Sequence, residues 1–406
     1  MNTPQEHILT GLKVLDLTRA LAGPSCTRML AEMGADVIKI EAAPDGDLTR
    51  RLSQYQNERS LYFIQQNLNK KSVCLNLRDP AAIPLLREIV PHVDIVVENF
   101  RPGIMATMGL DYNSLKAIRA DIILCSISAL GQTGPLALKP GYDYVAQAYA
   151  GITSMIGDPD AGPYIPLVGL GDISTGVHAA LAITAALLYH ARTGKGQHLD
   201  IALLDVYYHY HELNVHQFSG SHGEVEPTRA GRHMTYISPA GIFQATDGFV
   251  LIMAFMHHWK DLCAAMERPD LIEHEIYGDD SLRVEHREEV VEMIEQWLAG
   301  FADVGSAIAH LDAHDVPCAP ILSVAETVTH PHLVGRGTVR SITDRLAGEF
   351  KIPGNPLRFS EFPQPLDIEA PTLGQHNRTV LSQLLAKSDA EIDALYAAGV
   401  LHEREV

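Results

Sequence analysis

The stretch KVLDLTRALAGPSCTRMLAEMGADVIKI, residues 13–40, decides the fold. It begins with an apolar run at 13–17, continues with a helix-like segment at 24–33 that Gly34 ends, and closes with a second apolar run at 36–40. Two short β-rich runs joined by a helix are typical of parallel strands with a crossover helix. The sequence therefore predicts that the chain opens with a β-α-β unit.

The same alternation continues along the chain. Strand-like and helix-like runs follow one another at residues 73–77, 81–89, 94–97, 121–125, 177–191 and 199–203. We therefore expect an α/β fold with a doubly wound parallel sheet. In such sheets, ligands bind on the loops that follow the carboxyl ends of the strands.

A second, smaller unit is expected in the middle of the chain. The polar, glycine-bearing segment 219–231 looks like a boundary. It is followed by strand-like or helix-like runs at 248–253, 259–266 and 285–301, and by the segment VPCAP at 316–320. We predict a large domain made of residues 1–218 and 326–406, and a smaller inserted α+β domain at 219–325.

Composition limits the possible partners. The 406 residues are 46% hydrophobic and 20% charged, which suits a globular enzyme of about two domains. The formal net charge of −19 argues against nucleic acid and anionic membranes as partners. Five scattered cysteines without a C-x-x-C pair indicate neither a disulfide framework nor a zinc site.

Targeting signals are not apparent in the sequence. Residues 1–8 are polar and lack an apolar signal core, and no apolar run approaches the roughly 20 residues that a membrane span requires. We therefore expect a cytoplasmic protein with no membrane partner.

Several common site motifs are missing. The turn RALAGP at 19–24 lacks the G-x-G-x-x-G pattern, and neither a P-loop nor a G-x-S-x-G elbow occurs, which disfavours dehydrogenases and serine hydrolases. His209, Glu212 and His216 would share one helix face. A chain with 20 histidines produces such clusters by chance, so no metal site is predicted.

One carboxylate stands between glycines in GLGDISTG, residues 169–176, just before an apolar run at 177–189 that reads as a helix. Glycines remove side-chain bulk, so a large ligand can come close. A carboxylate at a helix start is expected to stay ionised. Asp172 is therefore either a nucleophile toward an activated acyl group or the cap of that helix.

Three further motifs accompany Asp172: LDLT and AGP at 15–18 and 22–24, VENFRPG at 97–103, and GYD at 141–143. With them the chain resembles the family III CoA-transferases, the group that includes formyl-CoA transferase and carnitine CoA-transferase. The resemblance extends through GADVIKIE at 34–41, NKKS at 69–72, TGKGQ at 193–197 and PTLGQH at 371–376. The order and spacing of these segments are highly specific, and they cover nearly the whole chain.

The resemblance implies an interlaced homodimer with a Rossmann-like, CoA-binding large domain and an inserted smaller domain. It also implies that Asp172 is the nucleophile. Its carboxylate would attack the thioester carbon of an acyl-CoA, giving a mixed anhydride and CoA thiolate, and exchange through an aspartyl-CoA thioester would pass CoA to a free acid. Backbone N–H groups at 169–171 and around Gly231 are the expected oxyanion donors.

A CoA channel is implied as well. Its expected lining is Ala20, Leu21 and Ala22 along the pantetheine, Leu75, Arg78, Asn99, Phe100 and Arg101 beside the nucleotide, and Lys139 and Tyr142 in the same channel. Arg78 and Arg101 are the expected phosphate ligands. Phe100 either packs on the adenine or sits in the core.

Two positions depart from the family pattern. Members often carry a basic residue where Ala42 stands, and some carry Arg near the position of Thr107. Arg50 or Arg51 could compensate. Which basic residues hold the CoA nucleotide therefore stays open at this stage.

On the acceptor side, Asp143 matches an acidic residue that faces the nucleophile in formyl-CoA transferase. It could orient groups around the anhydride or raise the pKa of Asp172. Its alternative role is to cap the helix that begins at Tyr144.

The family's longer glycine-rich lid is replaced here by AGRHMT, residues 230–235. Gly231, Arg232 and His233 are the candidate substrate residues in it. Arg232 could grip an acceptor carboxylate, or it could be a solvated surface residue.

Two other functions remain to be weighed. An α-methylacyl-CoA racemase has the same fold but places His where Tyr142 stands, and a phenol is a poor base at neutral pH. A CoA-binding protein without catalysis would not need Asp172 between glycines. We therefore expect a CoA-transferase that acts on an acyl-CoA and a free carboxylic acid, with no metal or redox cofactor. Succinyl-CoA and a small dicarboxylate are the suggested pair, although the sequence does not name the acids.

Overall fold

The computed structural model describes residues 6–52, 54–255, 257–362, 365–366 and 368–405. The chain forms two compact units, each described below by itself. Unit 1 comprises Met1–Ile152, Leu167–Glu212 and His332–Val406, and unit 2 comprises Thr153–Pro166 and Leu213–Pro331. The predicted limits of an inserted domain at 219 and 325 are a separate matter from these two units and stay a prediction.

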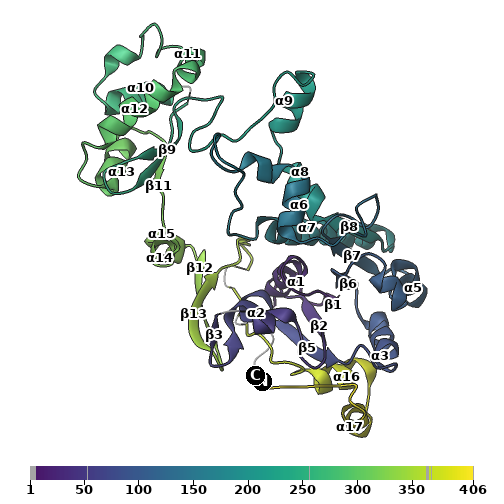
Figure 1. The fold of residues 1–406 in the computed structure, drawn as a ribbon. Helices are drawn as coiled ribbons and strands as arrows, with labels where there is room; N and C mark the ends of the chain where they lie inside the picture. Colours follow the sequence, from purple (N-terminus) through teal and green to yellow (C-terminus); the bar gives the residue numbers. More distant parts are fainter. Residues whose placement is uncertain (1–5, 53, 256, 363–364, 367, 406) are drawn as a thin grey trace. The chain divides into compact units, whose positions relative to one another are not determined.

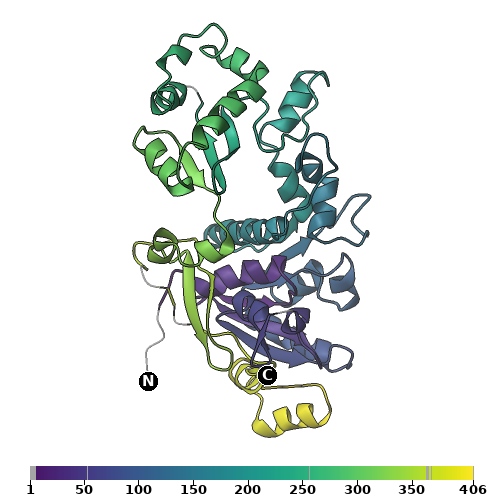
Figure 2. The ribbon, with the colours of Figure 1, turned by 60° about the vertical axis from the view of Figure 1, so that its left-hand side comes forward.

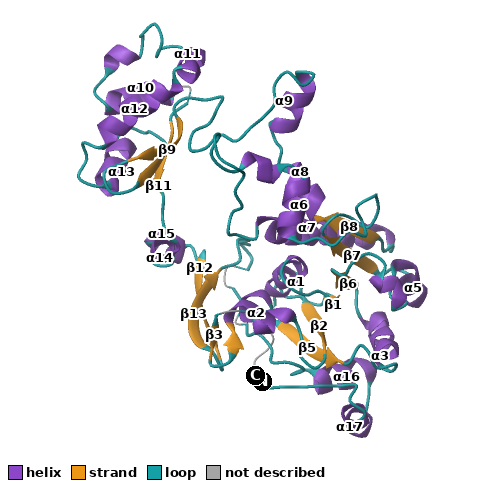
Figure 3. Cartoon of the chain, viewed as in Figure 1, coloured by secondary structure: helices purple, strands orange, loops and turns teal. Residues whose placement is uncertain are grey.

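Unit 1 is built around a six-stranded sheet (Figures 1 and 3). Its strands are β1 (Lys13–Asp16), β2 (Asp36–Ala42), β5 (Lys70–Leu75), β6 (Ile95–Glu98), β7 (Ile123–Ser128) and β8 (His198–Ala202). They lie in the order β5-β2-β1-β6-β7-β8, and every neighbouring pair is parallel. The predicted α/β class with a parallel central sheet is confirmed. The strand order reverses between β1 and β6, which makes this the switch point of the sheet.

Helices cover both faces of the sheet, and for this reason its strands are nearly continuous apolar runs. One face packs on α1 (Ala22–Glu32), α6 (Asp143–Tyr149), α7 (Leu170–Thr193) and α8 (Leu203–His209). The other packs on α3 (Ala82–Ile89), α5 (Tyr112–Ile118), α16 (Asn377–Leu385) and α17 (Asp389–Ala397). Successive residues of β1 serve the two faces, because Val14 joins the first core and Leu15 the second. Figure 2 shows α7 running alongside α1.

Smaller elements complete unit 1. They are the hairpins β3 (Tyr55–Gln56) with β4 (Arg59–Ser60) and β12 (Val339–Asp344) with β13 (Gly348–Pro353), the helices α2 (Leu61–Gln66) and α4 (Ile104–Thr107), and the 3-10 turns η1 (Leu48–Arg51) and η2 (Val90–His92). Two short helices, η3 (Ile152–Met155) and α15 (Pro331–Gly335), cross the limits between the units. The sequence reading found neither hairpin.

Helix α7 is longer than the helix expected at 177–191. It begins at Leu170, so Asp172 lies in its first turn. In the described residues, α7 is the one helix that is long and apolar enough to cross a membrane by length and composition. The expectation that no segment reaches that length does not hold by this measure, because the polar first turn hid the start of the helix. Ala179 and Ile183 of α7 are nevertheless buried in the core of unit 1. The absence of a membrane partner stays a prediction.

Unit 2 holds a three-stranded antiparallel sheet in the order β11-β10-β9. Its elements are β9 (Ala240–Gln244), β10 (Phe249–Met253), β11 (Cys318–Pro320), α9 (Asn214–Gly220), α10 (His258–Ala265), η4 (Pro269–Leu271), α11 (Asp280–Glu285), α12 (Arg287–Leu298), α13 (Val304–Asp312) and α14 (Val324–Thr327). Its core includes Phe243, Val250, Trp259 and Ile294. The helix expected at 285–301 appears as α12, and the preceding helix α11 was not expected from the sequence.

Candidate active site

Two loops of unit 1 meet at the switch point, one after β1 and one after β6. The Arg19 N–H donates to Asn99 Oδ1 at 2.9 Å, and Asn99 Nδ2 donates to the Arg19 carbonyl oxygen at 2.8 Å. This reciprocal pair holds the loop that contains residues 20–22 against the loop that contains residues 99–101. The structure therefore brings the expected pantetheine and nucleotide segments together at the place where open parallel sheets bind ligands.

The loop after β1 has an unusual backbone at Ala20. Its φ is +68°, a left-handed conformation that is uncommon for any residue except glycine. The Ala20 N–H donates to Asp47 Oδ1 at 3.3 Å, and Asp47 Oδ2 lies 2.9 Å from Lys39 Nζ. Strain of this kind persists only where the surroundings enforce it, and it clusters at binding sites.

The nucleotide-side candidates differ in what they could offer a ligand. Arg78 and Arg101 are exposed, and Arg101 Nη2 donates to the Leu138 carbonyl oxygen at 2.8 Å. The Leu75 side chain is fully buried, so a contact from this residue would have to come from its backbone. Phe100 is partly buried against the sheet core, which supports the core alternative while leaving part of the ring open.

Two further channel candidates lie in the segment before α6. Lys139 Nζ donates to the Tyr149 hydroxyl at 2.7 Å, and this ammonium lies 5.1 Å from the centre of the Tyr149 ring. The Tyr142 side chain is 82% exposed. Both are accessible to a ligand that would follow the loop.

Asp172 does not cap α7. The N-cap is Gly169, which has no side chain to offer. Instead, the Gly171 N–H donates to the Tyr207 hydroxyl at 2.9 Å, and the Asp172 N–H donates to Asp143 Oδ2 at 3.2 Å. Side chains of α8 and α6 thus satisfy two amides of the first turn that no helix can satisfy internally.

Asp143 likewise does not cap its own helix. The N-cap of α6 is Tyr142, with no side-chain hydrogen bond. The Asp143 carboxylate instead faces the start of α7, where it accepts from Asp172 N–H and from the Tyr207 hydroxyl. The structure therefore brings Asp143 and Asp172 together, and the alternative role expected for Asp143 is wrong.

The glycines around Asp172 serve close packing inside the protein. A Cβ at Gly169 would lie 2.8 Å from Leu21 Cδ2, and a Cβ at Gly171 would lie 2.2 Å from Tyr207 Cε2. Both distances are too short for any real Cβ. These glycines therefore let the start of α7 approach the loop after β1 and the Tyr207 ring, whereas the sequence reading assigned them to ligand access.

The environment of Asp172 opposes ionisation. Burial, and then the nearby carboxylate of Asp143, raise the pKa of Asp172 to about 7. The expectation that the helix start keeps Asp172 ionised does not hold, because the first-turn amides already donate hydrogen bonds to Tyr207 and Asp143. The predicted effect of Asp143 on the pKa of Asp172 has the expected direction.

Sequence reasoning missed two tyrosines at this site. Tyr207 contacts the first turn of α7 as described above. Tyr62 of α2 is also close, since burial and then the charges of Asp172 and Asp47 raise the pKa of its phenol to about 12. Neither tyrosine carries a local signal, because only the packing of α2 and α8 around the start of α7 gives them this position.

The backbone amides expected as oxyanion donors are partly committed. The Leu170 N–H donates to the Val168 carbonyl oxygen at 2.9 Å, and the Gly171 N–H is taken by Tyr207. In the described part of the chain, the Gly169 amide is the one member of 169–171 with no acceptor.

A buried ion network lies beneath the loop after β1. Lys70 Nζ is 3.2 Å from Asp16 Oδ2, and Arg50 donates to both oxygens of Glu41 at 2.7 and 2.8 Å. Lys39 joins the network through Asp47. The Arg50 guanidinium is thus paired with Glu41. Of the two arginines proposed to replace the missing basic residues of the nucleotide site, Arg51 is therefore the one that could contact a ligand. Arg51 is exposed and lies 3.1 Å from Asp45.

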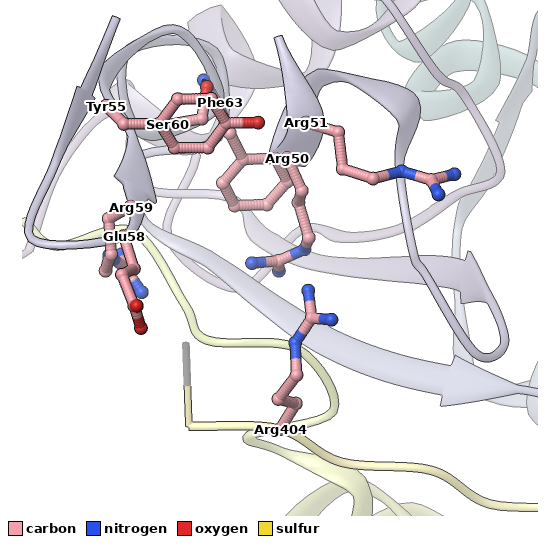
Figure 4. A pocket seen from close by; sticks show the side chains of 8 residues that line it. All are labelled: Arg50, Arg51, Tyr55, Glu58, Arg59, Ser60, Phe63 and Arg404. Atoms are coloured by element: carbon pink, nitrogen blue, oxygen red, sulfur yellow. The ribbon is translucent and has the colours of Figure 1, made fainter. Parts of the chain in front are cut away.

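Figure 4 shows the cavity of about 280 Å³ beside this network. Arg50 and Arg404 point toward one another across it, and the Arg50 guanidinium lies 3.6 Å from the centre of the Phe63 ring. Arg59 also lines the cavity and is paired with Asp344 at 2.8 Å. The arginines that hold carboxylates here support the fold of unit 1.

The candidate acceptor residues belong to unit 2. Gly231 has φ of +65°, and Arg232 lies 3.7 Å from Glu295, so this arginine is partly neutralised. The His233 ring packs 4.8 Å from the Phe243 ring, and burial, followed by the charge of Arg232, lowers the pKa of His233. The three candidates line a cavity of about 330 Å³ within unit 2. Their part in the reaction stays a prediction.

No metal cluster emerges from the parts of the chain that the structure describes, since no three His, Cys, Asp or Glu side chains there are arranged to hold an ion. His209 is instead 6.1 Å from the His178 ring, measured between ring centres.

With this geometry established, the chain can be compared with known proteins. Residues 9–377 match the family described as CoA-transferase family III. The chain belongs to this family. The predictions of the family and of a CoA-transferase enzyme are thereby confirmed.

Three relatives illustrate the match. Mouse succinyl-CoA:glutarate CoA-transferase is 34% identical over 98% of this chain and 91% of its own length. The succinate–glutarate CoA-transferase of Agrobacterium fabrum is 35% identical over 93% and 95%. The formyl-CoA:oxalate CoA-transferase of Rhodopseudomonas palustris is 32% identical over 97% of each chain.

A solved structure has the same fold. The CAIB/BAIF family protein from Brucella suis superposes with a TM-score of 0.83 at 34% identity, over 94% of this chain and 100% of that chain.

Proposed function

We propose that this chain moves CoA from an acyl-CoA to a free carboxylic acid through a covalent adduct on Asp172. The observation that carries the proposal is the place of Asp172 in the first turn of α7, beside Leu21 of the switch-point loop, with a pKa raised to about 7. A carboxylate that is basic and still ionised in part at neutral pH is a better nucleophile than an ordinary one.

The reaction proceeds by exchange at the aspartyl carbonyl. Asp172 attacks the thioester carbon and the C–S bond breaks. CoA leaves as a thiolate, and a mixed anhydride forms on Asp172. The thiolate then attacks the aspartyl carbonyl and releases the donor acid. The acceptor carboxylate attacks the resulting aspartyl-CoA thioester, and the thiolate attacks the acceptor carbonyl, which regenerates Asp172. Since one thioester replaces another, the protein contributes positioning and the exclusion of water.

CoA would run along residues 20–22 toward Asn99, Arg78 and Arg101, with CoA entering as a substrate and no permanent cofactor. The Gly169 amide is the candidate oxyanion donor beside Asp172, because its neighbours already have acceptors. The Gly231 N–H, expected from the sequence as another donor, already donates to the Gly157 carbonyl oxygen at 3.2 Å within unit 2.

The acids are proposed from the relatives and from Arg232. Two of the three relatives above carry succinyl-CoA or succinate with glutarate in their names, and the third carries oxalate. We infer succinyl-CoA as donor and a small dicarboxylate as acceptor, with Arg232 holding the second carboxylate.

We also infer a cytoplasmic homodimer. Supporting it, α7 exposes apolar side chains at helical spacing, with exposures of 42% for Val177, 66% for Leu181 and 62% for Leu188. Exposed apolar stripes of this kind mark protein interfaces. Light scattering that shows a monomer at micromolar concentration would remove this part of the proposal.

Trapping tests the central claim. Enzyme incubated with succinyl-CoA and hydroxylamine should carry a hydroxamate on Asp172, located by peptide mapping, because hydroxylamine attacks both the anhydride and the aspartyl thioester. Asp172→Ala should give no adduct, and Asp389→Ala, which changes a carboxylate that is 92% exposed, should give the same adduct as the wild type. An active wild-type enzyme that never carries the adduct refutes the mechanism. A panel of acids then identifies the acceptor.

A further inference from the structure

The Tyr207 hydroxyl is the meeting point of three elements at the candidate active site. It accepts from the Gly171 N–H at 2.9 Å and from Gln147 Nε2 at 3.1 Å. It donates to Asp143 Oδ1. The Tyr207 side chain is itself 1% exposed, so no water competes for these bonds.

The direction of these hydrogen bonds follows from the inventory of atoms. A phenol has one proton to give and two lone pairs that accept. The Gly171 N–H can only donate, so it must use a lone pair of Tyr207. Gln147 Nε2 uses the other lone pair, so the phenolic proton is directed at Asp143 Oδ1, which accepts it.

The other oxygen of Asp143 is committed in the same way. Asp143 Oδ2 accepts from the Asp172 N–H at 3.2 Å, and a backbone amide can only donate. Both oxygens of Asp143 therefore face donors. Hydrogen bonds donated to both oxygens fix the orientation of a carboxylate, so this arrangement holds the Asp143 carboxylate against the start of α7.

We propose that Tyr207 is a positioning residue that holds the Asp143 carboxylate beside Asp172, and that Asp172 is the member of the carboxyl pair that gains and loses the proton. This inference rests on the proposed role of Asp172 as nucleophile. It adds that the two carboxyl groups have different roles, and that Tyr207, which does not touch the reacting atoms, positions one of the two.

The groups around Asp172 agree with this assignment. Asp143 approaches the start of α7 from α6 and Tyr207 from α8, and the charge of Asp172 contributes to the raised pKa of Tyr62 on α2. Helix α1 contributes Ser25, which touches α7 at Gly176. Among the described residues, the charge that acts on Asp172 is therefore the negative charge of Asp143.

A fixed charge beside the nucleophile has a consequence for the reaction. The charge of Asp143 opposes the ionisation of Asp172 in the resting enzyme. Acylation removes the charge of Asp172 and therefore removes the repulsion. The same charge keeps Asp172 basic, and a more basic carboxylate attacks a thioester faster.

Tyr207→Phe tests the inference through the pH dependence of adduct formation on Asp172. In the wild type, the rate should rise with pH through an apparent pKa near 7, because only ionised Asp172 attacks. Without the phenolic hydrogen bond, Asp143 is no longer held against the start of α7, so its charge acts less on Asp172 and ionised Asp172 appears at lower pH. We expect the acid limb to move down by on the order of one pH unit. We also expect kcat to fall by about tenfold with little change in KM for the acyl-CoA.

Tyr208→Phe is the matched control. Tyr208 is the neighbour of Tyr207 on α8, but its side chain is 54% exposed. This variant should keep the wild-type limb and kcat. A Tyr207→Phe profile that superimposes on the wild-type profile overturns the inference, and an unchanged melting temperature would confirm that the variant is folded.

A spectroscopic titration gives a second, independent readout. Infrared spectra of the resting wild-type enzyme should contain carboxylic acid bands of Asp172 and of Glu98 that disappear near pH 7, because burial raises the pKa of both groups to about 7. Asp172→Asn should remove the band of Asp172 and leave that of Glu98. Asp143→Asn should keep both bands, with a lower midpoint for the band of Asp172. The reverse pattern, with one of the two bands lost in Asp143→Asn alone, overturns the assignment even if Tyr207→Phe does not fold.

The two proposals fail in different ways. If hydroxylamine traps nothing on Asp172 of the active wild-type enzyme, the proposed function is wrong. If the adduct forms normally and the acid limb of Tyr207→Phe does not move, only the role of Tyr207 is wrong.

Discussion

Unit 1 contains two sets of buried carboxylates whose acidities move in opposite directions. Beneath the loop after β1, burial would raise the pKa of Asp16, Glu41 and Asp47, but the cations paired with them outweigh it and hold all three pKa values below the usual range. At the start of α7, burial and the charge of Asp143 act together and raise the pKa of Asp172 to about 7.

The contrast shows that burial alone does not determine what a carboxylate does. A buried acid with a cation beside it becomes a permanent charge that holds backbone in place, as Asp47 holds the N–H of Ala20. A buried acid beside another acid keeps an accessible proton equilibrium and a basic oxygen. Strongly perturbed groups of the second kind are those expected to react.

The largest effect should come from removing the reactive member. Asp172→Ala should reduce kcat by about 10,000-fold or more, because the covalent path is lost and the residual rate comes from binding alone. The melting temperature should be at or above that of the wild type, since Asp172 has no cation to leave unpaired and its ionisation opposes folding. Steady-state kinetics with circular dichroism check both. If the variant keeps a tenth of the wild-type activity, Asp172 is not the nucleophile, and its role is structural like that of the buried carboxylates beneath the loop after β1.

A cation removed from the other set should act on stability. Lys39→Met leaves the buried Asp47 carboxylate without its cation and removes one of the positive charges that act on Asp16. This substitution should lower the free energy of unfolding by about 3–5 kcal/mol. Arg51→Met breaks the exposed pair with Asp45 and should change it by less than about 0.5 kcal/mol. Urea titrations measure both values. Equal effects of the two substitutions would contradict the distinction between buried and exposed pairs.

The raised pKa of Asp172 predicts a pH-dependent change in stability. An acid whose pKa is about 3.8 in the unfolded chain and about 7 in the folded one binds its proton more tightly when folded, so its contribution is full below pH 4 and is lost as pH rises through 7. Asp172→Asn removes that loss. Because the side chain is only partly buried, we expect the free energy of unfolding of the variant, relative to the wild type, to increase by on the order of 2 kcal/mol from pH 5 to pH 8. Urea unfolding at the two pH values measures this increase. A relative stability that is higher at pH 5 than at pH 8 would contradict the prediction.

A smaller effect than that of Lys39→Met should come from a neutral partner of the structural set. Ser72 Oγ donates to Glu41 Oε1 at 2.6 Å and accepts from the Gly374 N–H at 2.9 Å. Ser72→Ala should cost about 1–2 kcal/mol, because Glu41 keeps Arg50. The stability difference should become smaller at acid pH, where Glu41 is protonated in both proteins, and the loss of the acceptor for the Gly374 N–H should remain. A cost as large as that of Lys39→Met would mean that hydrogen bonds, and not the cations, hold this set.

Much of unit 1 could be predicted from local patterns. The strands at 13–17 and 36–40 and the helix between them appear within a residue or two of their expected bounds, because buried parallel strands are short apolar runs that glycine and polar turns interrupt. The hairpin β12–β13 was missed, since its strands expose alternate polar residues and resemble loops. Helix α7 was placed too late, because its first turn is capped from other helices and carries no capping residue of its own.

The sequence alone determined the family, the parallel sheet and the presence of a carboxylate between glycines ahead of a helix, because these depend on residue order over short distances. Only the tertiary structure decided the chemistry of that carboxylate. Asp143 and Tyr207 reach the start of α7 from α6 and α8, and the packing of these helices brings together residues 29 and 36 positions apart in the chain. The acidity of Asp172 depends on that packing, since charges interact through space and not along the sequence.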